Sequence, residues 1–469
     1  MHFPPTAPEG FSGRMKGSAM NSAMPLAIIV GFSLSGAARG SAPAGAPFLM
    51  PPTGKGEQLV GGLKHEAPSA LAFDKRNRPY LFHTRELESF GYILTLRGGK
   101  WVRLSYLAAL KRIHPKLQKP AKRFLHALGT MTIDDADGLY AILLVRTDAQ
   151  RSGWALLYSP DLAGSFQAHD LPCQAFLETR SGHNDLSAPP AIGLLKFRKS
   201  HPAQWTAYHE LSVTVPVKKA GRLELPAPVP VTADCFGISN HSGGYSFAVT
   251  TGRRTHLVYA EIPPDGKGNP TYAATYDRRT RKIAAKKLLC LAPPKTVDVH
   301  STPVIAADAR RHLHVIAGAH GQSFLYLRSL KPDRIDAGWS EAKPVGRRQT
   351  YATLLCDDND RLHTFFREWK SGATLSVQHK PARADAWGPS LTLVNAPLKQ
   401  RGYGIFYHRA WFDRAGAIYV SFTFNAQKGG VYPRALIVSE DGGKTWRLAT
   451  TETFVRRLRQ AKAAAATHR

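Results

Sequence analysis

The chain has 469 residues, with 63 Lys and Arg against 34 Asp and Glu, so its formal net charge is +29. This length does not limit the core, and large all-β folds use a comparable length as one domain. The excess positive charge predicts a polyanionic partner, with a general basic bias of composition as the alternative. Helix-turn-helix, RNP, zinc-finger and heptad patterns are missing from the sequence. Nucleic acid, an acidic polysaccharide and another anionic surface are all partners of this kind, and the charge alone does not select nucleic acid, which we do not expect to bind.

Residues 1–45 resemble an export signal followed by an unstructured stretch. Arg14 and Lys16 precede the apolar residues 25–34, and small residues follow at 35–38 and 41–42. An apolar run of this length is too short to span a bilayer as a helix. We therefore expect a secreted or periplasmic protein that is not inserted in a membrane.

Residues 46–452 carry a repeated pattern, in which a polar turn at an Asp is followed within about six residues by a short aromatic or β-branched strand. The turns are expected at Asp74, Asp135, Asp308, Asp358 and Asp413. The pattern at residues 252–259 adds a unit, and the gap between Asp135 and Asp308 has room for two units in all. Adjacent turns among these are 61, 50 and 55 residues apart. Repeats of about 50 residues that are dense in short strands are typical of a β-propeller, whereas a helical solenoid needs long helical stretches and a β-helix needs shorter repeats. We predict an all-β fold, a seven-bladed β-propeller of four-stranded antiparallel blades, as a single domain.

Within this domain, residues 297–321 predict a β-hairpin with a histidine at each end. Apolar residues 303–305 and 312–316 form the two expected strands, and residues 308–311 connect them. His300 precedes the first strand and His320 follows the second, so antiparallel pairing brings both to the same end of the sheet. Binding and catalytic residues concentrate at such loop ends. His314, in the middle of a strand, is expected to be a packed core residue.

The four cysteines, Cys173, Cys235, Cys290 and Cys356, are widely spaced and form no CxxC pair. This spacing excludes a zinc ribbon and a thioredoxin-type motif. Disulfide bonds and buried free thiols both stay open.

Residues 439–446 match the Asp-box pattern S-x-D-x-G-x-T-W, and a weaker echo begins at Ser159 and Asp161. In this motif Asp and Gly shape a hairpin turn, and the Trp packs beneath it. The motif supports the propeller fold, and we assign no catalytic role to Asp441. The basic tail, residues 453–469, is expected to be a short helix that closes nothing or to be solvated.

These motifs together resemble the BNR-repeat propellers that include the ulvan lyases and related uronate-specific polysaccharide lyases. The resemblance rests on residues 300–303 and 319–321, on Tyr351 and Arg367, and on the terminal Asp box, and it covers about residues 67–450. His300 and His320 are 20 residues apart, and Tyr351 and Arg367 are 16 apart. Both separations are similar to those of one ulvan lyase group.

The resemblance implies a polysaccharide lyase, an enzyme that cleaves a uronic-acid-containing polysaccharide by β-elimination. Such a reaction removes the C5 proton of a uronate and expels the oxygen at C4. Arg367, helped by His320, would neutralise the substrate carboxylate, because the guanidinium is a permanently charged fork. Tyr351 and His300 would supply the acid and the base, in an order that the sequence leaves open. Arg367 in an ion pair with Glu368 or Asp357 is the structural alternative.

Two further segments are candidates for substrate binding. The polar, glycine-containing residues 238–245 suit a loop that faces a sugar chain, which makes Asn240 and His241 binding candidates, although a simple hairpin turn explains them almost as well. By its place in the repeat, the segment before the last Asp turn puts His408 or Arg409 near the same end of the blades as His300 and Tyr351.

No metal or other cofactor is required for the expected catalysis, since Arg and His suffice to neutralise charge. A structural zinc or calcium ion is compatible with the resemblance, and Cys356, His363 and His408 are its candidate ligands, although their spacing is not diagnostic. We expect a monomer. A non-catalytic carbohydrate-binding propeller and a sialidase-like glycoside hydrolase are the alternatives, although the early Arg-Ile-Pro segment of sialidases is missing from the sequence.

Overall fold

The computed structural model describes residues 48–49, 70–82, 91–118, 129–148, 151–201, 206–237, 246–263, 267–293, 298–369, 373–395, 405–424 and 434–467. All of them belong to one compact unit, residues 41–469. The predicted export signal lies outside the described residues. No described helix is long and apolar enough to cross a membrane.

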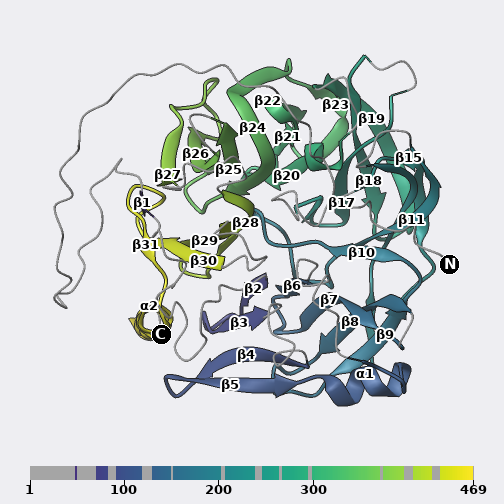
Figure 1. Cartoon of the computed structure of the whole chain (residues 1–469), viewed down its shortest axis with the longest axis vertical. Coiled ribbons are helices and arrows are strands. Elements are labelled where there is room, and N and C mark those ends of the chain that lie inside the picture. The colour runs from purple at the N-terminus through teal and green to yellow at the C-terminus, as the bar shows by residue number, and fades with distance from the viewer. Residues whose placement is uncertain are drawn as a thin grey trace, which may run out of the picture. The chain divides into compact units, whose positions relative to one another are not determined.

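Antiparallel four-stranded sheets are the recurrent element of this unit, and each is a meander in which neighbouring strands pair (Figure 1). The first contains β2 (Ala70–Phe73), β3 (Pro79–Phe82), β4 (Tyr92–Arg97) and β5 (Lys100–Ser105). The second contains β6 (Gly129–Ile133), β7 (Leu139–Arg146), β8 (Ser152–Ser159) and β9 (Gln167–Leu171). The third contains β10 (Gln174–Leu177), β11 (Ile192–Ser200), β12 (Ala207–Thr214) and β15 (Val229–Cys235). The fourth contains β16 (Ala248–Thr251), β17 (Arg254–Ala260), β18 (Asn269–Asp277) and β19 (Lys282–Ala292). The last contains β28 (Ile405–Phe412), β29 (Ile418–Phe424), β30 (Arg434–Ser439) and β31 (Arg447–Leu448).

Between the fourth and the last of these sheets lies a nine-stranded sheet made of two fused meanders. One meander contains β20 (Val304–Ala307), β21 (Leu313–Ala317), β22 (His320–Lys331) and β23 (Arg334–Trp339). The other contains β24 (Lys343–Cys356), β25 (Arg361–Trp369), β26 (Ala373–Pro381) and β27 (Leu391–Asn395), with β1 (Phe48–Leu49) parallel to β27. Pairing of β22 with β24 joins the two meanders. The predicted propeller of four-stranded antiparallel blades is confirmed, but the described residues form five separate four-stranded sheets and this fused sheet rather than seven separate blades.

Small elements complete the unit. A two-stranded ribbon contains β13 (Val217–Lys219) and β14 (Arg222–Glu224). Within the described ranges, the helices are α1 (Leu107–Ile113), the 3-10 turn Val299–Ser301 and α2 (Thr451–Thr467).

The core lies between the sheets, because successive side chains of a strand point to opposite faces and both faces are covered. In β7, for example, Leu139 and Ala141 pack against the first sheet, whereas Tyr140 and Ile142 pack against the third. Equivalent apolar layers join the third sheet to the fourth, the fourth to β20–β23, this meander to β24 and β25, and β25–β27 to the last sheet. A further layer joins the last sheet to the first, so the series of packed sheets closes on itself.

The predicted Asp turns connect the first two strands of five meanders, but two of them were placed one residue too late. Asp134 and Asp357, rather than Asp135 and Asp358, accept the backbone N–H groups of the turn. Asp74, Asp308 and Asp413 do so as predicted. With this correction, a Tyr or a His of the second strand follows the turn Asp by six residues in each of these hairpins. The unit expected at residues 252–259 is the β16–β17 hairpin, which turns without an Asp.

The Asp box at the β30–β31 turn has the expected structural role. Asp441 accepts the backbone N–H groups of Lys444 and Thr445 at 3.0 and 2.9 Å, and the indole of Trp446 donates to the Gly443 carbonyl at 3.1 Å. The echo at the β8–β9 turn is similar, since the Asp161 carboxylate accepts from the Ala163 N–H.

The C-terminal segment is not the solvated tail that the sequence suggested. Residues 451–467 form α2, whose Phe454 is buried in the layer between the first and last sheets. Arg457 in the same helix donates to both carboxylate oxygens of the buried Asp413, at 2.8 and 2.9 Å. The helix therefore covers the junction at which the series of sheets closes.

Candidate active site

The predicted hairpin brings His300 and His320 together at one end of the nine-stranded sheet. Val304 at the start of β20 pairs with Ile316 near the end of β21, as the sequence predicted. His300 lies in the 3-10 turn that precedes β20, and His320 is the first residue of β22. The centroids of the two imidazole rings are 5.2 Å apart.

One carboxylate holds both histidines, and the sequence analysis missed it. Asp298 caps the 3-10 turn, and one of its oxygens accepts from the His300 N–H at 2.8 Å and from His300 Nδ1 at 2.6 Å. Its other oxygen accepts from Nδ1 of His320. Burial raises the pKa of Asp298, but the hydrogen bonds from the two histidines outweigh burial and hold this pKa well below its usual range. With both Nδ1 atoms bound to an ionised carboxylate, Nε2 is the nitrogen that each ring presents to a ligand.

A glycine permits the close approach of the two histidine segments. Gly318 lies between β21 and β22. A Cβ atom at this position would be 2.4 Å from the carbonyl oxygen of Ser301 and 2.6 Å from that of Thr302. Because both neighbours are backbone atoms of the turn that carries His300, a larger residue would push this turn away from His320.

Tyr351 reaches the histidines because the backbone of β24 is irregular at this residue. Thr350 pairs with Arg367, and the register shifts between Thr350 and Thr353. Tyr351 has φ of +65°, a conformation that costs a bulky residue on the order of 1–3 kcal/mol. Bulges of this kind re-aim a side chain and are common next to active sites. The Tyr351 ring lies 5.3 Å from the His300 ring, measured between centroids.

Arg367 lies behind Tyr351 and not in the open. Its guanidinium carbon is 4.4 Å from the centroid of the Tyr351 ring and 4.4 Å from that of the Trp369 ring. Its Nη1 donates to the Tyr351 hydroxyl at 3.4 Å. Arg367 has no exposed surface. Its guanidinium therefore contacts Tyr351 directly, and it can contact a bulky ligand only if the surrounding side chains move.

Of the predicted binding residues, His408 lies at this cluster. Its ring is 6.3 Å from that of Tyr351, and its Nε2 donates to the carbonyl of Phe365 at 3.1 Å. Burial lowers the pKa of His408 to about 4, so the ring is neutral at pH 7. Arg409 is buried in the same strand. Asn240 and His241 lie outside the described residues.

The predicted metal ligands do not converge. His363 binds the Asp357 carboxylate and His379, and His408 binds Phe365, whereas Cys356 lies near His183 and Asp360. All four cysteines are free thiols. His314 is a buried core residue, as expected, with its Nδ1 at the Tyr326 hydroxyl.

The cluster combines groups that can exchange protons with groups that can stabilise negative charge. His300 and His320 have side chains that are 16% and 28% exposed, so a ligand can reach them, while Arg367 beside the phenol stabilises charge on its oxygen. Asp298, Gly318 and Trp369 were missed. The spacing Asp298-Val299-His300 was a signal for the first, because an Asp two residues before a His can cap its turn and bind its ring. Gly318 and Trp369 could not be predicted, because their effect depends on contacts with residues of other segments or of the folded strand.

The sequence matches the family model described as "BNR repeat-containing family member" over residues 270–467, which include the four predicted catalytic residues. The resemblance to BNR-repeat proteins is therefore confirmed for this part of the chain. No curated protein matches the sequence.

Several solved structures are similar, all at low sequence identity. A polysaccharide lyase described as an ulvan lyase, bound to -[GlcA(1-4)Rha3S]-, is 15% identical with a TM-score of 0.37, over 48% of this chain and 60% of that chain. A protein of unknown function from Dyadobacter fermentans is 11% identical with a TM-score of 0.41, over 67% and 94%. An α-L-arabinofuranosidase from Fusarium graminearum is 10% identical with a TM-score of 0.42, over 70% and 94%. The match thus spans less than two thirds of the length of the ulvan lyase.

Proposed function

We propose that the protein is a secreted or periplasmic polysaccharide lyase, which cleaves a uronic-acid-containing anionic polysaccharide by β-elimination. The observation that carries this proposal is the histidine pair held by Asp298 in ring contact with Tyr351, whose hydroxyl accepts a hydrogen bond from Arg367. This arrangement offers a base, an acid and stabilisation of negative charge within one cluster, which are the groups that the elimination needs. The net charge of +29 favours an anionic polymer as the substrate.

We assign the proton transfers to His300 and Tyr351, whose rings are in contact. Nε2 of His300 takes the C5 proton, the C–H electrons form the C4–C5 double bond, and the C4–O bond breaks. The Tyr351 hydroxyl gives its proton to the leaving oxygen. The reverse assignment, with Tyr351 as the base, or as base and acid in turn, uses the same atoms and stays open, because both rings lie within 5.3 Å of each other.

The burial of Arg367 changes the role that the sequence suggested for it. We assign binding of the substrate carboxylate to His320, because it is the more exposed of the two histidines. Its protonated ring would neutralise the carboxylate. Arg367 is then a positioning residue, which orients the Tyr351 hydroxyl and stabilises the negative charge left on its oxygen. The His408 ring also packs against the Tyr351 ring.

We count the fold as seven blades, taking β20–β23 and β24–β27 as two blades fused through β22 and β24. The apolar layers support this count, because each of the seven meanders packs against the next and the last packs against the first. We take the monomer as the functional unit.

The experiment is incubation of the full-length protein with a panel of uronate polysaccharides, an ulvan-like rhamnose and glucuronate polymer first, while the ultraviolet absorbance of an unsaturated uronyl product is recorded. His300→Ala and Tyr351→Phe are expected to lower the rate at least about 100-fold. Tyr158→Phe is the matched control, because Tyr158 is as buried as Tyr351 and belongs to the second sheet.

The outcomes separate the functional classes. An unsaturated product with wild-type protein, lost in His300→Ala and kept in Tyr158→Phe, supports the lyase. New reducing ends without ultraviolet absorbance would indicate a glycoside hydrolase. Retention on immobilised polysaccharide without any cleavage would indicate a carbohydrate-binding propeller and would overturn the proposed reaction.

A further inference from the structure

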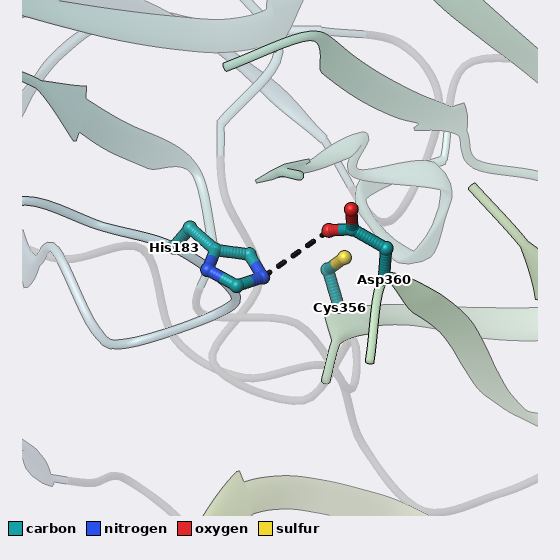
Figure 2. A group of neighbouring side chains, drawn as sticks. All are labelled: His183, Cys356 and Asp360. Atoms are coloured by element: carbon teal, nitrogen blue, oxygen red, sulfur yellow. Dashed lines mark ion pairs between the residues drawn. The ribbon is translucent and has the colours of Figure 1, made fainter. Parts of the chain in front are cut away.

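The described residues include two groups of side chains that could hold a metal ion, and one of them is Asp298 with His300 and His320 in the candidate active site. The other lies apart from that site and is formed by His183, Cys356 and Asp360 (Figure 2). Nε2 of His183 is 3.3 Å from a carboxylate oxygen of Asp360. The ligand atoms of the three residues, Nε2, Sγ and a carboxylate oxygen, all lie within 4.8 Å of one another. Tetrahedral zinc sites bring such atoms slightly closer, with metal–ligand bonds of about 2.0–2.3 Å.

Each ligand is held by its own backbone surroundings. The His183 N–H donates to the Ala307 carbonyl at 3.1 Å, and the Ser181 carbonyl accepts from the Cys356 N–H at 2.8 Å. Asp360 closes the turn that begins at Asp357, to whose carbonyl its N–H donates at 3.0 Å. The three side chains are thus fixed to segments that already contact one another, so little ordering is needed to bring them around an ion.

The types of the donor atoms select the class of metal. A thiol, an imidazole and a carboxylate form a mixed sulfur, nitrogen and oxygen set, which suits zinc and its chemical neighbours, whereas calcium and magnesium prefer oxygen ligands alone. Cys356 is buried, while the side chains of His183 and Asp360 are about one quarter exposed. The exposed side gives the ion a path of entry and room for a water molecule as a fourth ligand.

We propose that His183, Cys356 and Asp360 bind one zinc ion, which fastens the segment between β10 and β11 to the β24–β25 turn. This segment also bonds to the second and fourth sheets, because the Leu186 carbonyl accepts from the Asp135 N–H and the Asp185 N–H donates to the Thr250 carbonyl. A zinc ion at His183 therefore strengthens a connection that reaches four of the sheets. Nε2 of His183 donates to the Asp357 carbonyl at 3.2 Å in the structure. Metal binding replaces this hydrogen bond: the ring proton moves to Nδ1, Nε2 binds the ion, and the Cys356 thiol releases its proton to solvent.

The strand geometry gives this ion a structural rather than a catalytic place. Cys356 ends β24 and follows Tyr351 by five residues, and strands rise by about 3.3 Å per residue, so the two side chains are separated by roughly 15 Å along the strand. Asp360 and Arg367 are likewise at opposite ends of the β24–β25 hairpin. Zinc binding does not depend on the proposed lyase reaction.

The test uses full-length protein treated with a chelator, dialysed and titrated with Co²⁺ alone as a spectroscopic substitute for Zn²⁺. We expect one equivalent to bind, with the sulfur-to-cobalt charge-transfer absorption of a thiolate ligand, and Zn²⁺ to displace it and raise the Tm. Cys356→Ser removes the charge-transfer absorption. His183→Gln and Asp360→Asn weaken the affinity at least about tenfold, since even residues that only support metal ligands have effects of this size.

Cys173→Ser and Cys290→Ser are the matched controls, because both residues are free, partly buried thiols outside the nine-stranded sheet, Cys173 between β9 and β10 and Cys290 in β19. Their spectra and affinities are expected to equal those of the wild type. Wild-type protein that binds no cobalt, a thiolate band that survives in Cys356→Ser, or a band lost in either control would overturn the site. Should Cys356→Ser fail to fold, the wild-type and control spectra still decide whether a thiolate binds the metal, and His183→Gln decides which one.

Discussion

Gly318→Ala tests whether the close approach of two backbone segments builds the candidate active site. The added Cβ would lie 2.4 Å from the Ser301 carbonyl oxygen, whereas ordinary contacts begin near 3.4 Å, so the turn that carries His300 has to move by about 1 Å. Overpacking of this kind typically costs about 1–3 kcal/mol. A displacement of about 1 Å between reacting groups can lower a rate on the order of 100-fold.

The assay measures kcat and KM for formation of the unsaturated product, together with the Tm of the same preparation. We expect kcat to fall on the order of 100-fold while the Tm falls by only a few degrees, because the strain is local and the packed sheets are large. The loss of rate then reports the displaced His300 rather than unfolding.

Gly153→Ala is the matched control, since the added Cβ of Gly153, in β8, would meet side-chain atoms rather than backbone, a methyl group of Thr147 at 3.2 Å and a carboxylate oxygen of Asp170 at 3.9 Å. This variant should keep wild-type kcat and Tm within error. A Gly318→Ala protein with unchanged kcat, or one in which Gly153→Ala has the same effect, would refute the idea that the tight crossing at Gly318 positions the histidines.

Three further changes probe the charges that the structure buries. Asp298→Asn should lower kcat on the order of 100-fold with little change in Tm, because a neutral amide oxygen cannot hold both imidazole N–H groups as an ionised carboxylate does. Burial lowers the pKa of His379 from 6.5 to about 3, so in this pH range the unfolded chain binds a proton that the folded chain does not bind. Stability should therefore fall as the pH drops from 6.5 towards 3. In His379→Gln this fall should be smaller, as measured by urea unfolding at a series of pH values. Arg457→Met should lower stability by about 3–5 kcal/mol, because it leaves the Asp413 carboxylate buried without its partner.

Each of these changes has an outcome that would count against it. Asp298→Asn with full activity would mean that the shared carboxylate does not set the histidines. His379→Gln with the same acid dependence as the wild type would assign the acid sensitivity to other buried groups. For Arg457→Met the comparison is Arg459→Met, two residues later and exposed in α2, and equal effects of the two would show that the ion pair with Asp413 contributes nothing specific.

The fold was predictable to the extent that it repeats. The Asp turns and the Asp box are local signals, and both form as the sequence indicated apart from a shift of one residue at Asp134 and Asp357, where two consecutive acidic residues left the choice open. The fusion of two meanders could not be predicted, because it depends on the pairing of β22 with β24, a contact between strands whose sequences resemble those of any other blade edge. The role of α2 was missed because a sequence of alanines and arginines is typical of a solvated helix. The burial of Phe454 and Arg457 shows that one side of α2 packs against the sheets.

The candidate site was predictable in its residues but not in their arrangement. The spacing of His300 and His320 was enough to bring them together, since it follows from the pairing of a short hairpin. The burial of Arg367 between two rings was not, because it depends on Trp369 two residues later and on the irregular backbone at Tyr351. Contact of Arg367 with the substrate carboxylate stays a prediction, and the structure shows only that its guanidinium is buried against the Tyr351 and Trp369 rings.

Pairing with a carboxylate does not by itself mark the candidate catalytic histidines, since the same sheet contains His–Asp pairs at both of its ends. His314 binds Asp308 and His363 binds Asp357, and in both pairs the imidazole is completely buried and its two nitrogens are bound within the protein. These pairs stabilise the turns between strands and offer no nitrogen to a ligand. Asp298 differs because it occupies only Nδ1 of each of two partly exposed rings, which leaves Nε2 of both available to a ligand. What distinguishes the candidate site is therefore one carboxylate shared between two accessible imidazoles, and Asp298→Asn is the change that separates this arrangement from the structural pairs.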